Sequence, residues 1–158
     1  MRDEIELTLR LLAAALFTGL VGWERETAGK SAGLRTHVLV GVASALFVVV
    51  GISVSFEAAS SSPNVRIEPI SLIQAVAVGI GFLGSGIVRL RSDGERPQGL
   101  TTAASIWAAA GLGLAAGFGK YFIAGGTTLL LLIVLRGVEQ LERRYIDRLR
   151  DRGRTDHD

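Results

Sequence analysis

The chain has 158 residues, of which 49% are hydrophobic, with 17 basic and 15 acidic side chains and no cysteine. The near balance of charge argues against a surface that follows nucleic-acid phosphates, and the lack of cysteine excludes disulfides and thiolate metal sites. We therefore expect no nucleic-acid partner. The mean hydropathy of +0.41 is higher than is usual for a soluble domain, so we expect a membrane protein.

Apolar residues are gathered in long runs, which is typical of membrane spans. A helix needs about 20 apolar residues to cross a hydrocarbon core of about 30 Å. The first run carries only Glu6 and Arg10 near its start, and a very short hairpin separates the last two runs. The sequence therefore predicts an all-α transmembrane bundle of five spans, at residues 5–23, 37–56, 70–88, 102–119 and 121–135.

Basic residues predict the orientation of these spans. Lys and Arg in short loops favour the cytoplasmic side of a membrane. They are concentrated after the first, third and fifth spans, so we expect the N-terminus outside and the C-terminus in the cytoplasm. The predicted organisation is a membrane domain over residues 1–138 and a charged cytoplasmic tail over residues 139–158.

Small residues are dense in the third span. Its segment GIGFLG matches a dinucleotide-binding fingerprint, but that motif requires a strand before it and a helix after it, so we reject this interpretation. Glycines in a membrane helix let a neighbouring helix approach closely. We predict a packing face, or alternatively a broken helix that lines a polar cavity, at Gly79, Gly81, Gly84, Ser85 and Gly86.

Charged residues cluster in the expected loop between the first two spans. Structural salt bridges with Arg25, Arg35 or Arg89 are one interpretation, and cation binding is another. Magnesium uses one or two carboxylates and keeps several waters. Glu24 and Glu26 are two positions apart and would face different ways on a regular helix, so only an irregular loop would let both bind one Mg²⁺.

Several polar residues stand at the expected ends of spans. We expect Thr36 to cap the second span, and Thr101 and Thr102 to cap the fourth. The chain lacks a recognisable catalytic constellation, so we do not expect an enzyme. The candidate functional cluster comprises Glu24, Arg25, Glu26, Arg35, Thr36, His37, Arg89, Thr101 and Thr102.

Three segments resemble the MgtC/SapB family of bacterial membrane proteins. They read GLVGWERETAGKSAGLRTHVLVGVASALF, QAVAVGIGFLGSGIV and GLTTAASIWAAAGLGLAAG. The resemblance covers roughly the whole membrane region. The resemblance implies that longer members of the family carry a soluble domain after the last span, whereas here a short tail follows, so the activity of such a domain is not carried over.

The resemblance implies a bacterial cytoplasmic membrane protein that is linked to magnesium homeostasis or to growth at low magnesium, in a family with virulence-related members. It also implies action on membrane-protein partners, including the ATP synthase, and Mg²⁺ is the candidate cofactor. Our leading hypothesis is a non-enzymatic protein that binds a membrane partner or forms a homodimer within the lipid bilayer. The alternatives are a transporter or channel for a cation or small solute, and a lipid-binding or scaffolding protein.

Overall fold

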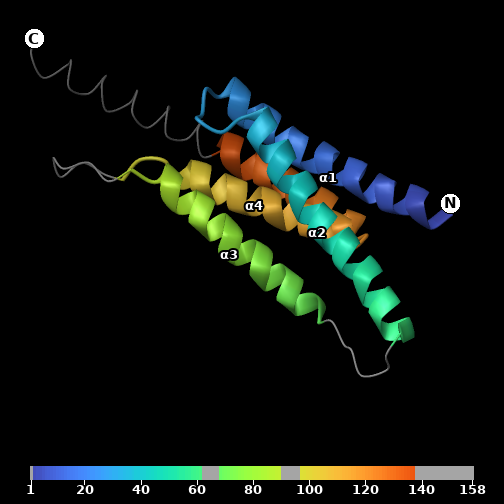
Figure 1. The fold of residues 1–158 in the computed structure, drawn as a ribbon. Coiled ribbons are helices and arrows are strands. Elements are labelled where there is room, and N and C mark those ends of the chain that lie inside the picture. The colour runs from blue at the N-terminus through green and yellow to red at the C-terminus, as the bar shows by residue number, and fades with distance from the viewer. Residues whose placement is uncertain (1, 62–67, 90–96, 138–158) are drawn as a thin grey trace, which may run out of the picture. The chain divides into compact units, whose positions relative to one another are not determined.

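The structure is a computed structural model, and it describes residues 2–61, 68–89 and 97–137 (Figure 1). Within these residues every regular element is a helix, and the one further feature is an isolated antiparallel bridge between Arg89 and Gln98. The predicted all-α class is therefore confirmed. The helices are α1 (Arg2–Thr27), α2 (Leu34–Ser61), α3 (Pro69–Ile87), α4 (Leu100–Gly117) and a fifth, shorter helix, Tyr121–Gly137.

Helices α1 to α4 each have the length and hydropathy of a membrane span. The fifth helix, Tyr121–Gly137, is apolar but at the short end of the range that can cross a bilayer. This arrangement confirms the predicted helical membrane bundle, whereas its orientation stays a prediction. Residues up to Thr128 form one packed body. The predicted tail at residues 139–158 lies outside the described residues.

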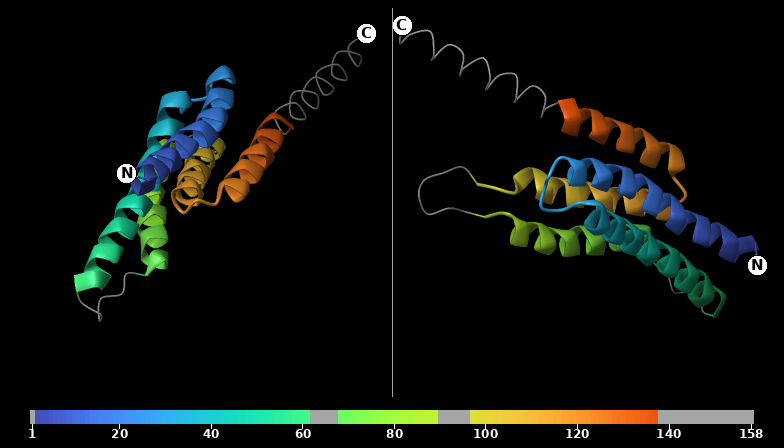
Figure 2. Two further views of the ribbon diagram at one scale, coloured as in Figure 1. Left: turned by 90° about the vertical axis from the view of Figure 1, so that its right-hand side faces the viewer. Right: turned by 90° about the horizontal axis from the view of Figure 1, so that it is seen from above.

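Helix α4 packs against α1, α2 and α3, while α2 also packs along α1 (Figures 1 and 2). The backbones approach closely at glycines. A Cβ atom at Gly113 of α4 would overlap the carbonyl group of Gly41 in α2, and one at Gly41 would overlap the side chain of Thr18 in α1. These three helices therefore meet with almost no space between them.

Helix α3 is packed less completely. Its buried residues Val76 and Ile80 join Ile106 and Ala110 of α4 in one hydrophobic cluster. Its contact with α2 is slight compared with the other helix pairs that touch. One side of α3 is therefore held by α4, and most of the remaining surface is uncovered by the described elements.

Helix α1 extends beyond residue 23, where the predicted span ended. The prediction that residues 24–26 lie in a loop is therefore wrong. Glu24, Arg25 and Glu26 lie on the last turns of the helix, which ends at Thr27. A Schellman motif follows, in which Gly29 has a φ of 67° and the Lys30 N–H donates to the Arg25 carbonyl at 3.0 Å. The backbone carbonyls of Glu24, Arg25 and Glu26 all accept hydrogen bonds from the residues that follow. The helix ends where Gly29 adopts the left-handed conformation.

Candidate functional site

A polar pocket of about 470 Å³ lies at the end of the bundle where the α1–α2 turn, the end of α3 and the start of α4 meet. The hydroxyl-bearing residues Ser31 and Thr36 line one part of it, and Arg89 and Gln98 line another. Backbone hydrogen bonds in both directions between Arg89 and Gln98, each 3.1 Å, hold the end of α3 next to the start of α4. The pocket thus gathers residues from three separate parts of the sequence.

His37 is fully buried close to this end of the bundle and is hydrogen-bonded at both ring nitrogens. Nδ1 donates to the Gly33 carbonyl at 2.8 Å, because a carbonyl oxygen can only accept. Nε2 lies 3.1 Å from Oγ of Ser105, a hydroxyl that is also placed to donate to the Thr102 carbonyl at 2.8 Å. A hydroxyl has one proton, so Ser105 pairs with a neutral ring by donating to Nε2 or with a charged ring by accepting from it.

Glu24 and Arg25 are buried although both side chains are ionisable, with exposed fractions of 3% and 2%. The Oε2 atom of Glu24 and the Nε atom of Arg25 are buried, and neither has a hydrogen-bond partner among the described residues. The Arg25 guanidinium lies within Coulombic range of the His37 ring. Burying an ionised group without a partner is costly, so these two atoms are the part of the site that the fold itself leaves unsatisfied.

Glu26 has a structural role that the sequence did not indicate. It is exposed, and its Oε2 atom accepts a hydrogen bond of 2.8 Å from the Leu34 backbone N–H, at the first residue of α2. A Cβ atom at Gly33 would lie 2.7 Å from that oxygen, so the turn requires a small residue here. The carboxylate of Glu26 is thus used to cap α2, where the positive end of the helix dipole favours an anion.

The three threonines predicted as caps do not act as caps. Thr36 lies inside the first turn of α2, where Glu26 provides the cap instead. Helix α4 begins at Leu100 with Gly99 at the N-cap, at a φ of 86° and without a side-chain cap. Thr101 and Thr102 consequently lie within its first turn, one exposed and the other buried.

The predicted magnesium pair is separated by this geometry. Glu24 and Glu26 lie on a regular helix, one buried and the other exposed, and Glu26 is already engaged with Leu34. In the part of the chain that the structure describes, no three acidic or metal-ligating side chains are grouped. A site with one carboxylate and bound waters would fit the unpartnered Glu24 oxygen. Cation binding stays a prediction.

The remaining candidates in the charged cluster are at the surface. Arg35 and Arg89 are exposed, and only Arg89 lines the polar pocket. Gln98 and Ser31 also line the pocket, and Ser105 contacts the buried His37 ring. The sequence had indicated none of these three residues. The one signal for Ser105 was its position one helical turn after Thr102.

The small residues of α3 lie on an unbroken helix that faces mostly open space. A Cβ atom would meet nothing within 4 Å at Gly79, Gly81 or Gly86, and at Gly84 only Ala103 at 3.8 Å. Ser85 is exposed and donates to the Phe82 carbonyl at 2.7 Å. A packing role for this segment stays a prediction for contacts outside the described chain.

Comparison with known proteins gives the following relatives. The MgtC family model matches residues 11–144. The Escherichia coli K12 protein named "Putative magnesium transporter YhiD" is 38% identical over 143 residues, which are 90% of this chain and 65% of that protein. Protein SapB of Bacillus subtilis strain 168 is 36% identical over 128 residues, 81% of this chain and 54% of SapB. Protein MgtC of Salmonella typhimurium LT2 is 36% identical over 135 residues, 84% of this chain and 53% of MgtC.

This chain spans between 53% and 65% of the length of those three relatives. No solved structure matches it. The family match covers most of the spans described above, and the relatives match at more than a third of positions. The chain therefore belongs to the MgtC family, as a multi-pass protein of the bacterial cytoplasmic membrane.

Proposed function

We propose that this chain is a non-enzymatic membrane protein of magnesium homeostasis or low-magnesium adaptation that acts through contact with another membrane protein or with a second copy of itself. The link to magnesium comes from the family and from relatives with names such as MgtC and magnesium transporter. The mode of action, by contact, is supported by the surface of α3.

One stripe of α3 is the observation that carries this proposal. Val78, Gly81, Phe82 and Ser85 recur at helical spacing, so they share a face. Val78 and Phe82 are 75% and 80% exposed, and a Cβ atom at Gly81 would meet nothing. Gly81 and Ser85 form a small-xxx-small pair, which allows another membrane helix to approach closely. We call this stripe the outward face of α3.

The alternative function is a transporter or channel for a cation or small solute, and the relative YhiD is named "Putative magnesium transporter". The unpartnered, buried Glu24 oxygen favours it, because intramembrane carboxylates often mark ion paths. The contact between Gly113 and Gly41 counts against a path among α1, α2 and α4, since the backbones touch there. A path along α3 would need a further element to enclose it.

Flux and cross-linking together separate the two functions. Because the chain has no cysteine, single-cysteine variants can report contacts directly. We expect Phe82→Cys on the outward face to cross-link to a partner or to a second copy in native membranes. Phe122→Cys is the matched control, since Phe122 is fully exposed on a different helix.

The same protein in proteoliposomes should give no Mg²⁺ uptake above that of empty vesicles. Robust, protein-dependent uptake would establish the transporter function and overturn the proposal. Equal or absent cross-linking at positions 82 and 122 would remove the outward face of α3 as the contact surface. The ATP synthase is the first partner to look for among the cross-linked proteins.

A further inference from the structure

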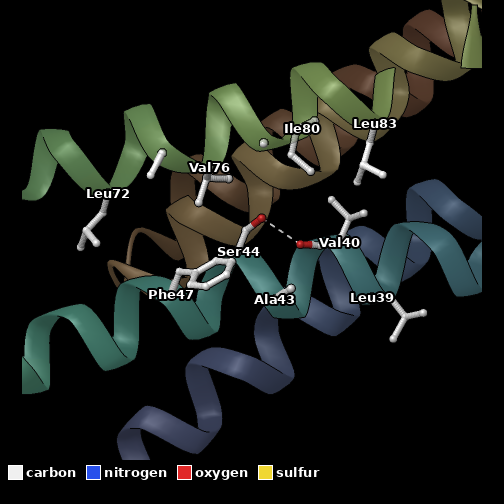
Figure 3. Close-up of a pocket in the computed structure, with 11 residues that line it drawn as sticks. Leu39, Val40, Ala43, Ser44, Phe47, Leu72, Val76, Ile80 and Leu83 are labelled. Atoms are coloured by element: carbon white, nitrogen blue, oxygen red, sulfur yellow. Dashed lines mark hydrogen bonds between the residues drawn. The ribbon is translucent and has the colours of Figure 1, made fainter. Parts of the chain in front are cut away.

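A second cavity lies next to the polar pocket. It is an apolar groove of about 510 Å³ between α2 and α3, and it extends from Leu39 and Leu83 at one end to Phe47 and Leu72 at the other (Figure 3). Among the described residues that line it, Ser44 alone has a polar side chain, and that hydroxyl already donates to the Val40 carbonyl of its own helix at 2.8 Å. The groove therefore offers an occupant no unsatisfied polar group from a side chain.

The groove exists because α2 and α3 are both held by α4 but hardly touch each other. Figure 3 shows Val40 and Ser44 of α2 pointing toward Val76 and Ile80 of α3 across this space. The rims stay open to the surroundings, since Leu39 is 70% exposed and Phe47 is 61% exposed. An occupant can thus enter sideways from the bilayer.

The polar pocket and the apolar groove are two neighbouring cavities between the same helices, and we call the two together the crevice. Thr36 lines the pocket, and Val40, one helical turn further along α2, lines the groove. On α3 the same step leads from Ile87 in the pocket to Leu83 in the groove. The crevice is consequently polar at the end of the bundle and apolar along the helices that have the hydropathy of membrane spans.

The polar end has the charge to receive a phosphate group. Arg89 lines it, and none of its described lining residues is acidic. The N-terminus of α4 lies there at Gly99, where no described side chain caps it, and the positive end of the helix dipole favours an anion. The Ser31 and Thr36 hydroxyls and the Gln98 amide add hydrogen-bond donors.

We propose that this crevice binds one anionic phospholipid, with its phosphate in the polar pocket and an acyl chain in the apolar groove. Each half of the crevice has a volume in the range of ligand sites, about 300–1,000 Å³, and the two halves together match the two halves of such a lipid. A free phosphate would need only the pocket, and a helix from a second copy would need only the groove.

Native mass spectrometry of the full chain in detergent tests this proposal, with phosphatidylglycerol, phosphatidylcholine or inorganic phosphate added in separate titrations. The wild type should retain phosphatidylglycerol in preference to phosphatidylcholine. Arg89→Ala should reduce that preference about fivefold, the effect of losing one basic contact to an anionic lipid.

Gly79→Phe should abolish lipid retention, because Gly79 lines the groove and has open space into which a phenyl ring can project. Gly81→Phe is the matched control, since Gly81 lies on the same helix with the same open space but lines neither cavity. The control should retain lipid while it weakens the cross-linking from the outward face of α3. Failure of the partner proposal is thereby kept separate from failure of the lipid proposal.

Three outcomes would overturn the lipid proposal. One is equal retention of phosphatidylglycerol in Gly79→Phe and Gly81→Phe. A second is binding of inorganic phosphate with no retained lipid, which would identify a free-phosphate site. The third is a lipid-free dimer that Gly79→Phe converts into a monomer, which would identify a helix of the second copy as the occupant of the groove.

Discussion

The Nε2 atom of His37 lies 3.1 Å from the Oγ atom of Ser105, and this contact joins α2 to α4 at a point where the imidazole is wholly buried. The ring is fixed from its other side by the Gly33 carbonyl. A Cβ atom at Gly22 would lie 2.8 Å from the His37 Cβ, so α1 passes close to the same residue. Three helices thus come together at one buried polar side chain.

Ser105→Ala should lower the stability of the bundle, because it removes the partner of His37 Nε2 in a site that water does not reach. Leaving a buried polar group unsatisfied costs about 1–3 kcal/mol. The thermal unfolding midpoint in detergent measures the loss. Ser85→Ala is the control, since the Ser85 hydroxyl is exposed and donates to the Phe82 carbonyl of its own helix. Equal midpoints for the two variants would show that the His37 contact contributes little.

Glu26→Ala should destabilise the α1–α2 turn by about 0.5–2 kcal/mol, the usual cost of losing a helix cap. Glu26→Gln should recover part of the loss, since its amide oxygen can still accept from the Leu34 N–H but carries no charge for the helix dipole. Glu68→Ala serves as the comparison, because Glu68 stands at the N-cap of α3 without a side-chain cap bond. The order of thermal midpoints among these variants checks the assignment, and a fully stable Glu26→Ala would refute it.

Gly113→Ala and Gly111→Ala should have opposite effects although they lie on the same helix. A methyl group at position 113 would overlap the Gly41 carbonyl, so α2 and α4 must separate, and overpacking of this kind typically costs about 1–3 kcal/mol. Position 111 faces open space, and there alanine should stabilise the helix slightly, by up to about 1 kcal/mol. Monodisperse yield and thermal midpoint measure both effects, and matching results for the two variants would contradict the close backbone contact.

The membrane bundle could be predicted because hydropathy and span length depend only on local sequence, and the sequence runs place all five helices. The helix ends could not. Glu24 to Glu26 look like loop residues, yet the backbone of α1 continues through them until Gly29 ends the helix. The spacing of Gly79 and Gly81 indicated close packing, but spacing does not show which side of a helix its neighbours occupy, and here the neighbours lie elsewhere.

The polar pocket could be predicted only in part, because local sequence shows which residues are polar but not which helices meet. Arg89 and Thr36 stood out because they are polar residues at the ends of apolar runs. Ser105 lies within an apolar run, and its role depends on the distance between two helices, which the sequence does not give. Glu26 drew attention as a charge, whereas its use as a cap for α2 depends on how the turn at Gly33 folds back.

Glu24→Gln should separate stability from function. The Glu24 Oε2 atom is buried without a partner, and a neutral amide of the same shape avoids the cost of burying a charge. We therefore expect an unchanged or raised thermal midpoint. We also expect Glu24→Gln to fail to restore growth at low magnesium in a strain that lacks the protein, because the buried carboxylate serves a function. Functional sites commonly keep residues that lower the stability of the fold.

Glu26→Gln is the matched control for that experiment, since it removes a carboxylate two residues away that is exposed and already used as a cap. It should lower the thermal midpoint modestly and still support growth at low magnesium. We thus expect Glu24→Gln to keep or raise the thermal midpoint and to fail in growth, and Glu26→Gln to lower the midpoint and to support growth. Growth with Glu24→Gln equal to that of the wild type would show that the buried carboxylate has no role in the response to magnesium, and would leave Arg89 and the polar pocket as the functional part of this end of the bundle.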